Sequence, residues 1–204
     1  MLDTNEVLTW RYLLDKGLTP YGAAGLMGNL YVESGFKPNN LENYGNKLLK
    51  MSDEEYTKQV QNGTYTKFVD DGLGYGLAQW TWWSRKEGLL KASKETKLPI
   101  DSLKLQLDYL YLELSTGYGN VLNVLKRARN VQEPTELVMK KFERPLDQSD
   151  NAVKNRINYS MDIYKRQVAN DLKIKQHEIN KTKFLKTKLV PENEHSTIIA
   201  NKHY

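Results

Sequence analysis

The segment "TPYGAAGLMGNLYVESG" constrains the fold of this chain more than any other stretch. Thr19 followed by Pro20 is typical of a helix start, and Gly35 is typical of the position just past a helix end, so the segment predicts a helix of about 14 residues. Three glycines share one broad face inside it: Gly22, Gly25 and Gly28. Because each costs about 1 kcal/mol of helix stability relative to alanine, we expect a compensating contact. The spacing therefore predicts a buried helix against which another helix packs very closely.

Apolar periodicity and turn residues predict further helices along the chain. These helices cover approximately 3–16, 52–62, 82–97, 101–115, 118–129, 134–143 and 153–168. Residues 36–51 are predicted to be irregular, and the glycine-rich, aromatic segment 64–83 is predicted to form a small β-hairpin or an ordered loop. The expected fold class is α+β, predominantly α-helical. One domain is expected over 1–165, followed by a basic tail or linker over 166–204 that is partly helical and then disordered.

The distribution of cysteine and histidine excludes several kinds of active site from residues 1–164. Cysteine is absent, and the three histidines lie in the tail, at His177, His195 and His203. A Ser-His-Asp triad, a Cys-His pair and a histidine-ligated zinc site are therefore excluded from the body. Its chemistry must come from carboxylates, Lys, Tyr, hydroxyl groups or a hard cation held by oxygen. No cofactor and no metal site is predicted.

The formal net charge of +5 lies entirely in the tail, where residues 165–204 hold nine Lys and Arg against four Asp and Glu. Such a segment could bind anionic wall polymers, nucleic acid or a membrane surface, and a solvated linker is the favoured alternative. The neutral body argues against a nucleic-acid binder. No apolar run of about 18 residues predicts a membrane span. The N-terminus lacks the pattern of a secretory signal.

Glu33 lies at the C-terminal end of the predicted glycine-rich helix, in "YVESGFKP". Leu26, Asn29 and Leu30 lie one and two turns before it on the same face. Apolar neighbours and the negative end of a helix dipole both raise the pKa of a carboxyl group. Since an acid with a raised pKa can donate a proton near neutral pH, Glu33 is a candidate general acid. A solvated surface glutamate is the alternative.

The segment "GYGLAQWTWW" indicates a sugar-binding surface. It places the amide of Gln79 among the aromatic side chains of Tyr75, Trp80 and Trp82. Aromatic faces beside an amide suit a sugar ring, which has apolar C–H faces and a hydroxyl rim. Core packing is the alternative for these aromatic residues, and it is the preferred interpretation of Trp83.

Three stretches together resemble the phage tail lysozyme family: "LLDKGLTPYGAAGLMGNLYVESGFKP", "GYGLAQWT" and "ELVMKKFERP". Known members include the N-terminal domain of the tail-knob hydrolase of small Bacillus phages. The resemblance implies a lysozyme-like fold that cleaves the β-1,4 glycan between N-acetylmuramic acid and N-acetylglucosamine. It implies that Glu33 is the catalytic acid, and that the segment around Tyr75, Gln79 and Trp80 lines the glycan cleft.

The resemblance also implies where the protein acts and with what. The substrate is bacterial peptidoglycan, and the expected protein partners are a phage tail or other wall-hydrolase domains. The protein is expected to act on the cell wall, either as part of the virion or after release from the cytoplasm. Nucleic acid is not an expected partner.

The resemblance supplies no second carboxylate. Asp70 and Asp71 precede the glycine-rich loop and could face Glu33, although Asp-Asp-Gly is also typical of a turn. Glu42 is a more distant candidate. Without a second carboxylate, attack by the sugar's own hydroxyl would give an anhydro product, as in lytic transglycosylases. A non-catalytic module that binds wall glycan is the remaining alternative.

The "FERP" segment is interpreted as structural. Phe142 is expected in the core, Pro145 is expected to end a helix, and Glu143 or Arg144 is expected to pair within the fold. A cleft role for Glu143 is the alternative.

Overall fold

The computed structural model describes residues 3–188, and the chain divides into two units between Gln167 and Val168. The helices of the first unit are α1 (Thr4–Asp15), α2 (Pro20–Ser34), α3 (Asn43–Leu49), α4 (Asp53–Gln61), α5 (Trp83–Thr96), α6 (Leu103–Gly117), α7 (Gly119–Arg127), α8 (Gln132–Leu137), the π-helix η1 (Val138–Glu143) and the beginning of α9 (Asp150–Lys188). The described part of the second unit is the continuation of α9 from Val168. None of the described helices combines the length and apolar character that crossing a membrane requires.

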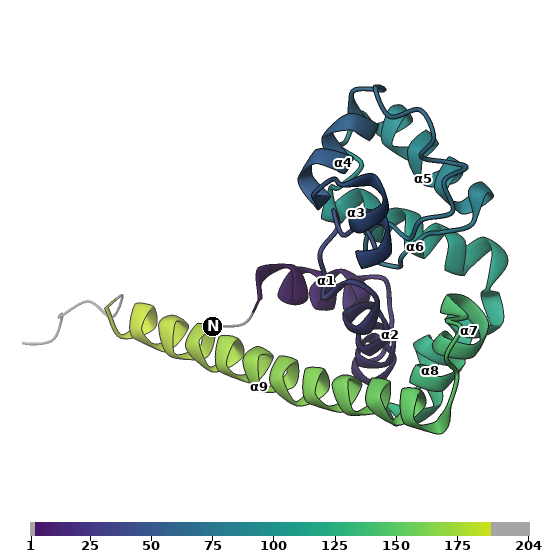
Figure 1. The fold of residues 1–204 in the computed structure, drawn as a ribbon. Helices are drawn as coiled ribbons and strands as arrows, with labels where there is room; N and C mark the ends of the chain where they lie inside the picture. The colour runs from purple at the N-terminus through teal and green to yellow at the C-terminus, as the bar shows by residue number, and fades with distance from the viewer. Residues whose placement is uncertain (1–2, 189–204) are drawn as a thin grey trace, which may run out of the picture. The chain divides into compact units, whose positions relative to one another are not determined.

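α2 is the central helix of the first unit, as its sequence predicts. The Thr19 side chain accepts a hydrogen bond from the Gly22 backbone N–H at 3.1 Å, and Pro20 is the first helical residue. Gly35 ends the helix in the left-handed conformation, with φ of 60°. The helix is buried over most of its length and contacts α1, α7 and α8 (Figure 1). The boundaries of α2 and its burial thus both agree with the prediction from the sequence.

The three glycines of α2 allow three other helices to come close. An added methyl group would overlap the carbonyl oxygen of Leu125 at Gly22, lie 2.8 Å from the Pro134 ring at Gly25, and overlap the Ser160 hydroxyl at Gly28. α7, α8 and α9 therefore each approach α2 more closely than any residue with a side chain would allow. The predicted close packing is confirmed.

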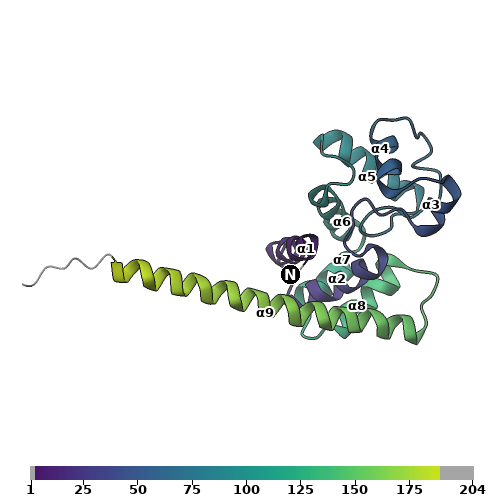
Figure 2. The same ribbon diagram turned by 60° about the vertical axis from the view of Figure 1, so that its left-hand side comes forward.

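Figures 1 and 2 show two groups of helices on opposite sides of α6. α3, α4 and α5 lie on one side, and α1, α2, α7 and α8 lie on the other. α6 itself contacts α1, α5 and α7. The loop between α4 and α5 belongs to the first group, and α2 and η1 belong to the second. Residues of both groups line the candidate site.

The segment 64–82 forms an ordered loop, and the predicted β-hairpin is not present. Its β structure in the described residues is limited to single bridges of Tyr75, with Leu41 and with Trp80. Tyr75 and Trp80 exchange backbone hydrogen bonds of 3.2 and 3.0 Å around a turn in which Gly76 and Gln79 have positive φ. Residues 73–78 are all buried, so both faces of the segment pack into the helical core and no longer ladder forms. The first unit is predominantly helical, and the α+β class is not supported.

One helix was not predicted, and two others differ from their predicted extent. α3 lies in the stretch predicted to be irregular. Its N-cap residue, Glu42, makes no side-chain capping hydrogen bond, so the usual local signal of a helix start is missing there. The predicted helix 134–143 is present, but it begins at Gln132 and changes to the wider π-helix at Val138. α9 continues to Lys188, past the decay of the apolar pattern near residue 172. The "PENEHST" stretch that was predicted to be disordered lies outside the described residues.

Candidate active site

A cleft of about 1060 Å³ opens in the first unit between the loop that precedes α5 and the end of η1. Its lining includes Glu33, Gln79, Trp82, Arg85, Tyr118 and Glu143. Glu33 comes from the last turn of α2, and Glu143 is the last residue of η1. Glu42 and Phe142 also line the cleft, so three carboxyl groups and three aromatic side chains share one cavity.

Glu33 is held in place by an arginine from α9. The Arg156 Nη2 group donates to Glu33 Oε1 at 2.5 Å, and its Nε group donates to Asn29 Oδ1 at 3.0 Å. Asn29 is fully buried one turn before Glu33, and its Nδ2 group donates to the carbonyl oxygens of Gly25 and Thr135. The Glu33 side chain keeps 17% of its surface exposed. It is therefore fixed by buried partners while it still reaches the cleft.

The position of Arg156 depends on a glycine of α2. Gly28 leaves room for the Ser160 hydroxyl and for the backbone carbonyl of Arg156. The Ser160 hydroxyl donates to that carbonyl at 2.9 Å, and Thr135 donates to the Ser160 hydroxyl at 2.8 Å. The close approach of α9 to α2 thus brings the guanidinium group within reach of Glu33. Sequence analysis did not identify Arg156, because no local pattern relates residues 123 positions apart.

Glu143 is the second carboxyl group of the cleft for which the structure suggests a chemical role. Its Oε1 atom is buried and accepts no hydrogen bond from any described residue. Burial raises the pKa of the Glu143 carboxyl well above its ordinary value of 4.5, and the Glu33 carboxylate raises that pKa further. Arg85 and Arg156 oppose the increase. Such a group stays protonated at a pH where an ordinary glutamate is ionised.

The backbone around Glu143 is irregular. Residues from Val138 form a π-helix, and the Arg144 N–H closes it with a hydrogen bond of 2.8 Å to the Met139 carbonyl oxygen. Arg144 itself has φ of 53°, which is rare for a residue with a side chain. Short π-helical segments occur frequently at functional sites. Glu143 or Arg144 was expected to pair within the fold, but Glu143 Oε1 has no hydrogen-bond partner among the described residues. Phe142 is in the core, as expected.

The residues predicted to bind sugar divide into two pairs. Gln79 and Trp82 line the cleft, and Trp82 is 67% exposed. Both N–H bonds of the Gln79 amide are used within the loop, by the carbonyl oxygens of Asn40 and Gly76. Tyr75 and Trp80 are fully buried, so neither presents a ring face to the cleft.

Trp80 instead supports the wall of the cleft. Its indole N–H donates to Glu113 Oε2 at 2.8 Å, and Arg85 binds the same carboxylate through two hydrogen bonds of 2.7 and 2.8 Å. The Arg85 guanidinium group lies 4.8 Å from the centre of the Phe142 ring. This arrangement connects α5, α6 and η1 behind the cleft surface. Trp80 therefore contributes to the site through Arg85.

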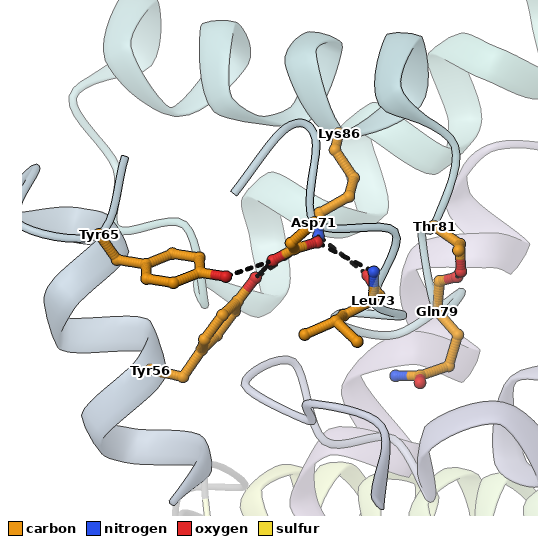
Figure 3. A network of polar contacts seen from close by, with 7 residues as sticks. All are labelled: Tyr56, Tyr65, Asp71, Leu73, Gln79, Thr81 and Lys86. Carbon is orange, nitrogen blue, oxygen red and sulfur yellow. Dashed lines mark hydrogen bonds and ion pairs between the residues drawn. The ribbon is translucent and has the colours of Figure 1, made fainter. Parts of the chain in front are cut away.

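Asp71 belongs to the buried polar network of Figure 3. Its two oxygens accept hydrogen bonds from the Tyr56 hydroxyl at 2.6 Å, the Tyr65 hydroxyl at 3.2 Å and the Leu73 N–H at 2.9 Å. They also bind the Lys86 ammonium group, which is fully buried and whose pKa is lowered by burial and raised by Asp71. These partners hold the loop between α4 and α5 in place.

Only some of the candidates for a second carboxylate therefore line the cleft. Asp70 is exposed and Asp71 is enclosed in its network, and the cleft lining includes neither of them. Glu42 and Glu143 do line the cleft. Across residues 3–188, no cluster of three or more Asp, Glu and His side chains is arranged to hold a metal ion.

The fold and site define a predominantly helical domain with a cleft that contains carboxyl groups. The chain belongs to the phage tail lysozyme family, whose model matches residues 4–166. This membership indicates a lysozyme-like peptidoglycan hydrolase with glycosidase activity that acts on the bacterial cell wall in association with the virion. The matched range contains Glu33, Glu143 and Arg156 and ends just before the second unit. A comparison with curated proteins finds no match.

Proposed function

We propose that the first unit cleaves the β-1,4 bond between N-acetylmuramic acid and N-acetylglucosamine, with Glu33 as the general acid. One observation carries this proposal: Glu33 is fixed by Arg156, which Asn29 holds in turn, and it still lines a cleft of about 1060 Å³. Exposed Trp82 on the same cleft offers a ring face to the apolar side of a sugar. A glycan strand in the cleft would place its glycosidic oxygen at Glu33.

In this proposal Glu33 gives its proton to the glycosidic oxygen as the bond from that oxygen to the anomeric carbon breaks. The leaving sugar departs with a free hydroxyl group, and the anomeric carbon acquires oxocarbenium character. A water molecule then adds to that carbon and completes the hydrolysis. Arg156 positions the Glu33 carboxyl group before the step and stabilises its negative charge afterwards.

Formation of an anhydro product, as in a lytic transglycosylase, is the second candidate. It is favoured by the absence of Asp70 and Asp71 from the cleft lining, because the sequence offered these two as partners of Glu33. Hydrolysis is favoured by the presence of Glu143 in that lining. We place hydrolysis first because a second carboxyl group beside Glu33 is the feature shared by hydrolytic glycosidases.

Two finer aspects of the function are also proposals. One is a similarity to the tail-knob hydrolase of small Bacillus phages. The other is binding of anionic wall polymers by the basic segment from Val168 onward, which carries an excess of lysine.

Mass spectrometry of digested peptidoglycan tests the proposal. The wild-type protein should release fragments with reducing N-acetylmuramic acid ends.

Glu33→Gln should lower the rate by a factor of about 10² to 10⁴, which is the usual contribution of general acid catalysis. The same variant should still fold and still bind cell walls. A variant with more than about a tenth of the wild-type rate would contradict the role of Glu33, and anhydro ends would establish the transglycosylase outcome. Binding without any cleavage by the wild type would identify a glycan-binding module.

A further inference from the structure

Three carboxyl groups and two guanidinium groups interact at the cleft, and Glu33, Arg85 and Glu143 line it. Arg85 binds Glu113 through two hydrogen bonds, and Arg156 binds Glu33 through one. Glu143 is the third carboxyl group, and its buried Oε1 atom has no donor among the described residues. Each arginine is therefore already engaged with another carboxylate. The cluster has one carboxyl group more than it has cations.

The charged groups around Glu143 determine whether this third carboxyl group is ionised or protonated. The groups that act on it come from four different helices: Glu33 of α2, Arg85 of α5, Glu113 of α6 and Arg156 of α9. Two of them repel a negative charge on Glu143, and the two that attract it are engaged elsewhere. An ionised and buried carboxylate without a partner costs several kcal/mol, so the group is expected to keep its proton instead. Each arginine then has one carboxyl partner, Glu113 for Arg85 and Glu33 for Arg156, and the protonated third carboxyl group needs no cation.

We propose that Glu143 is a positioning residue that keeps one proton in the pair it forms with Glu33, so that Glu33 can deliver a proton to the glycosidic oxygen near neutral pH. This role rests on the proposed function of Glu33. Because Glu33 Oε1 accepts a hydrogen bond from Arg156, this oxygen carries no proton in that arrangement, and a source of protons within the cleft is needed. Glu143 is the buried neighbour that can hold one. The two carboxyl groups line the same cleft and repel one another electrostatically, so the proton they share belongs to the pair.

The proton balance of the cycle closes without another reactant. The proton held by the pair passes to the glycosidic oxygen through Glu33 as the glycosidic bond breaks. Both carboxyl groups are then ionised, next to the guanidinium groups of Arg85 and Arg156. The attacking water supplies a hydroxyl group to the anomeric carbon and leaves its second proton on the pair. The enzyme returns to its starting protonation state.

The pH dependence of glycan cleavage tests this role. Glu143→Gln keeps the shape of the side chain but cannot exchange a proton. Its rate should fall at neutral pH and recover in acid, so that the basic limb of the profile moves down by about one pH unit or more. Recovery in acid would show that the variant is folded. Glu133→Gln, at an exposed position of α8, is the matched control, and its profile should coincide with that of the wild type.

A Glu143→Gln profile that superimposes on the wild-type profile would overturn the proposal, whatever the absolute rate. A uniformly lower rate without a shifted limb would also overturn it, since that result indicates a structural role alone. Failure of the wild type to cleave any glycan would instead contradict the proposed function.

Infrared spectroscopy gives a readout that does not need activity. The wild type and Glu133→Gln should show the carbonyl band of a protonated carboxylic acid at neutral pH, and Glu143→Gln should lack it. If the wild type has no such band, the proton-holding role is wrong. Because this measurement is independent of substrate, it distinguishes failure of the inference from failure of the proposed function.

Discussion

The buried ammonium group of Lys86 binds the Asp71 carboxylate at 2.5 Å and connects the loop after α4 to helix α5. Neither side chain is more than 5% exposed. The same carboxylate accepts two tyrosine hydroxyls and a backbone N–H, so every approach to it is occupied (Figure 3). The adjacent Gly72 lines the cleft and neither Asp71 nor Lys86 does, so the pair supports the loop without lining the cavity.

Asp71→Asn should destabilise the protein by about 3–5 kcal/mol, because it leaves the Lys86 charge buried without a counter-ion. Asp70→Asn changes an exposed neighbour and should stay within about 0.5 kcal/mol of the wild type. Denaturant unfolding of both variants measures the difference. Asp71→Asn should retain glycan cleavage per folded molecule at low temperature. Wild-type stability combined with lost cleavage would assign Asp71 a catalytic role instead.

Gly22→Ala should disturb the contact of α2 with α7. Its methyl group would overlap the backbone carbonyl oxygen of Leu125, which cannot move away as a flexible side chain can. We expect a loss of stability of about 1–3 kcal/mol, or more, from the enforced displacement. Gly117→Ala is the control, because nothing lies within 4 Å of its added methyl group and alanine favours a helix. Equal melting temperatures for the two variants would contradict the close packing of α2.

The stability of the folded state should fall as the pH rises above the ordinary glutamate value of 4.5 toward the raised pKa of Glu143. In this window the unfolded chain has released the Glu143 proton while the folded protein still holds it. Folding therefore takes up a proton, and the free energy of unfolding decreases with pH. Glu143→Gln should remove this slope and be more stable than the wild type at the upper end of the window. Parallel stability curves for the two proteins would contradict the raised pKa.

A chain that ends at Leu172 should keep the melting temperature and the cleavage activity of the first unit. It loses most of the excess of Lys and Arg, so its adhesion to cell walls should be weaker at low salt. The two forms should converge at high salt, where screening removes the electrostatic contribution. Co-sedimentation with walls over a salt series measures this. Equal adhesion at all salt concentrations would exclude an electrostatic role for the basic segment.

Local sequence signals were sufficient for α2 and for the position of Glu33 on it. The Thr19 cap, Pro20 and Gly35 act on the residues next to them, so the sequence alone predicts where this helix begins and ends. The glycine spacing predicted close packing because a helix that carries this cost needs compensation from a neighbour. The absence of cysteine and histidine from the body likewise left carboxyl groups as the main candidates for chemistry.

Only the tertiary structure decided which side chains reach the cleft. Trp80 and Trp82 are two positions apart in one aromatic run, yet the first is fully buried and the second is 67% exposed. The loop that contains them is shaped by contacts with helices distant in sequence, among them the bonds of Trp80 to Glu113 and of Asp71 to Lys86. In the same way, Arg156 binds Glu33 and Glu143 shares its cleft, although both are more than a hundred residues away in sequence. Burial and charge pairing depend on which segments come together in space, and no local pattern in the sequence encodes that proximity.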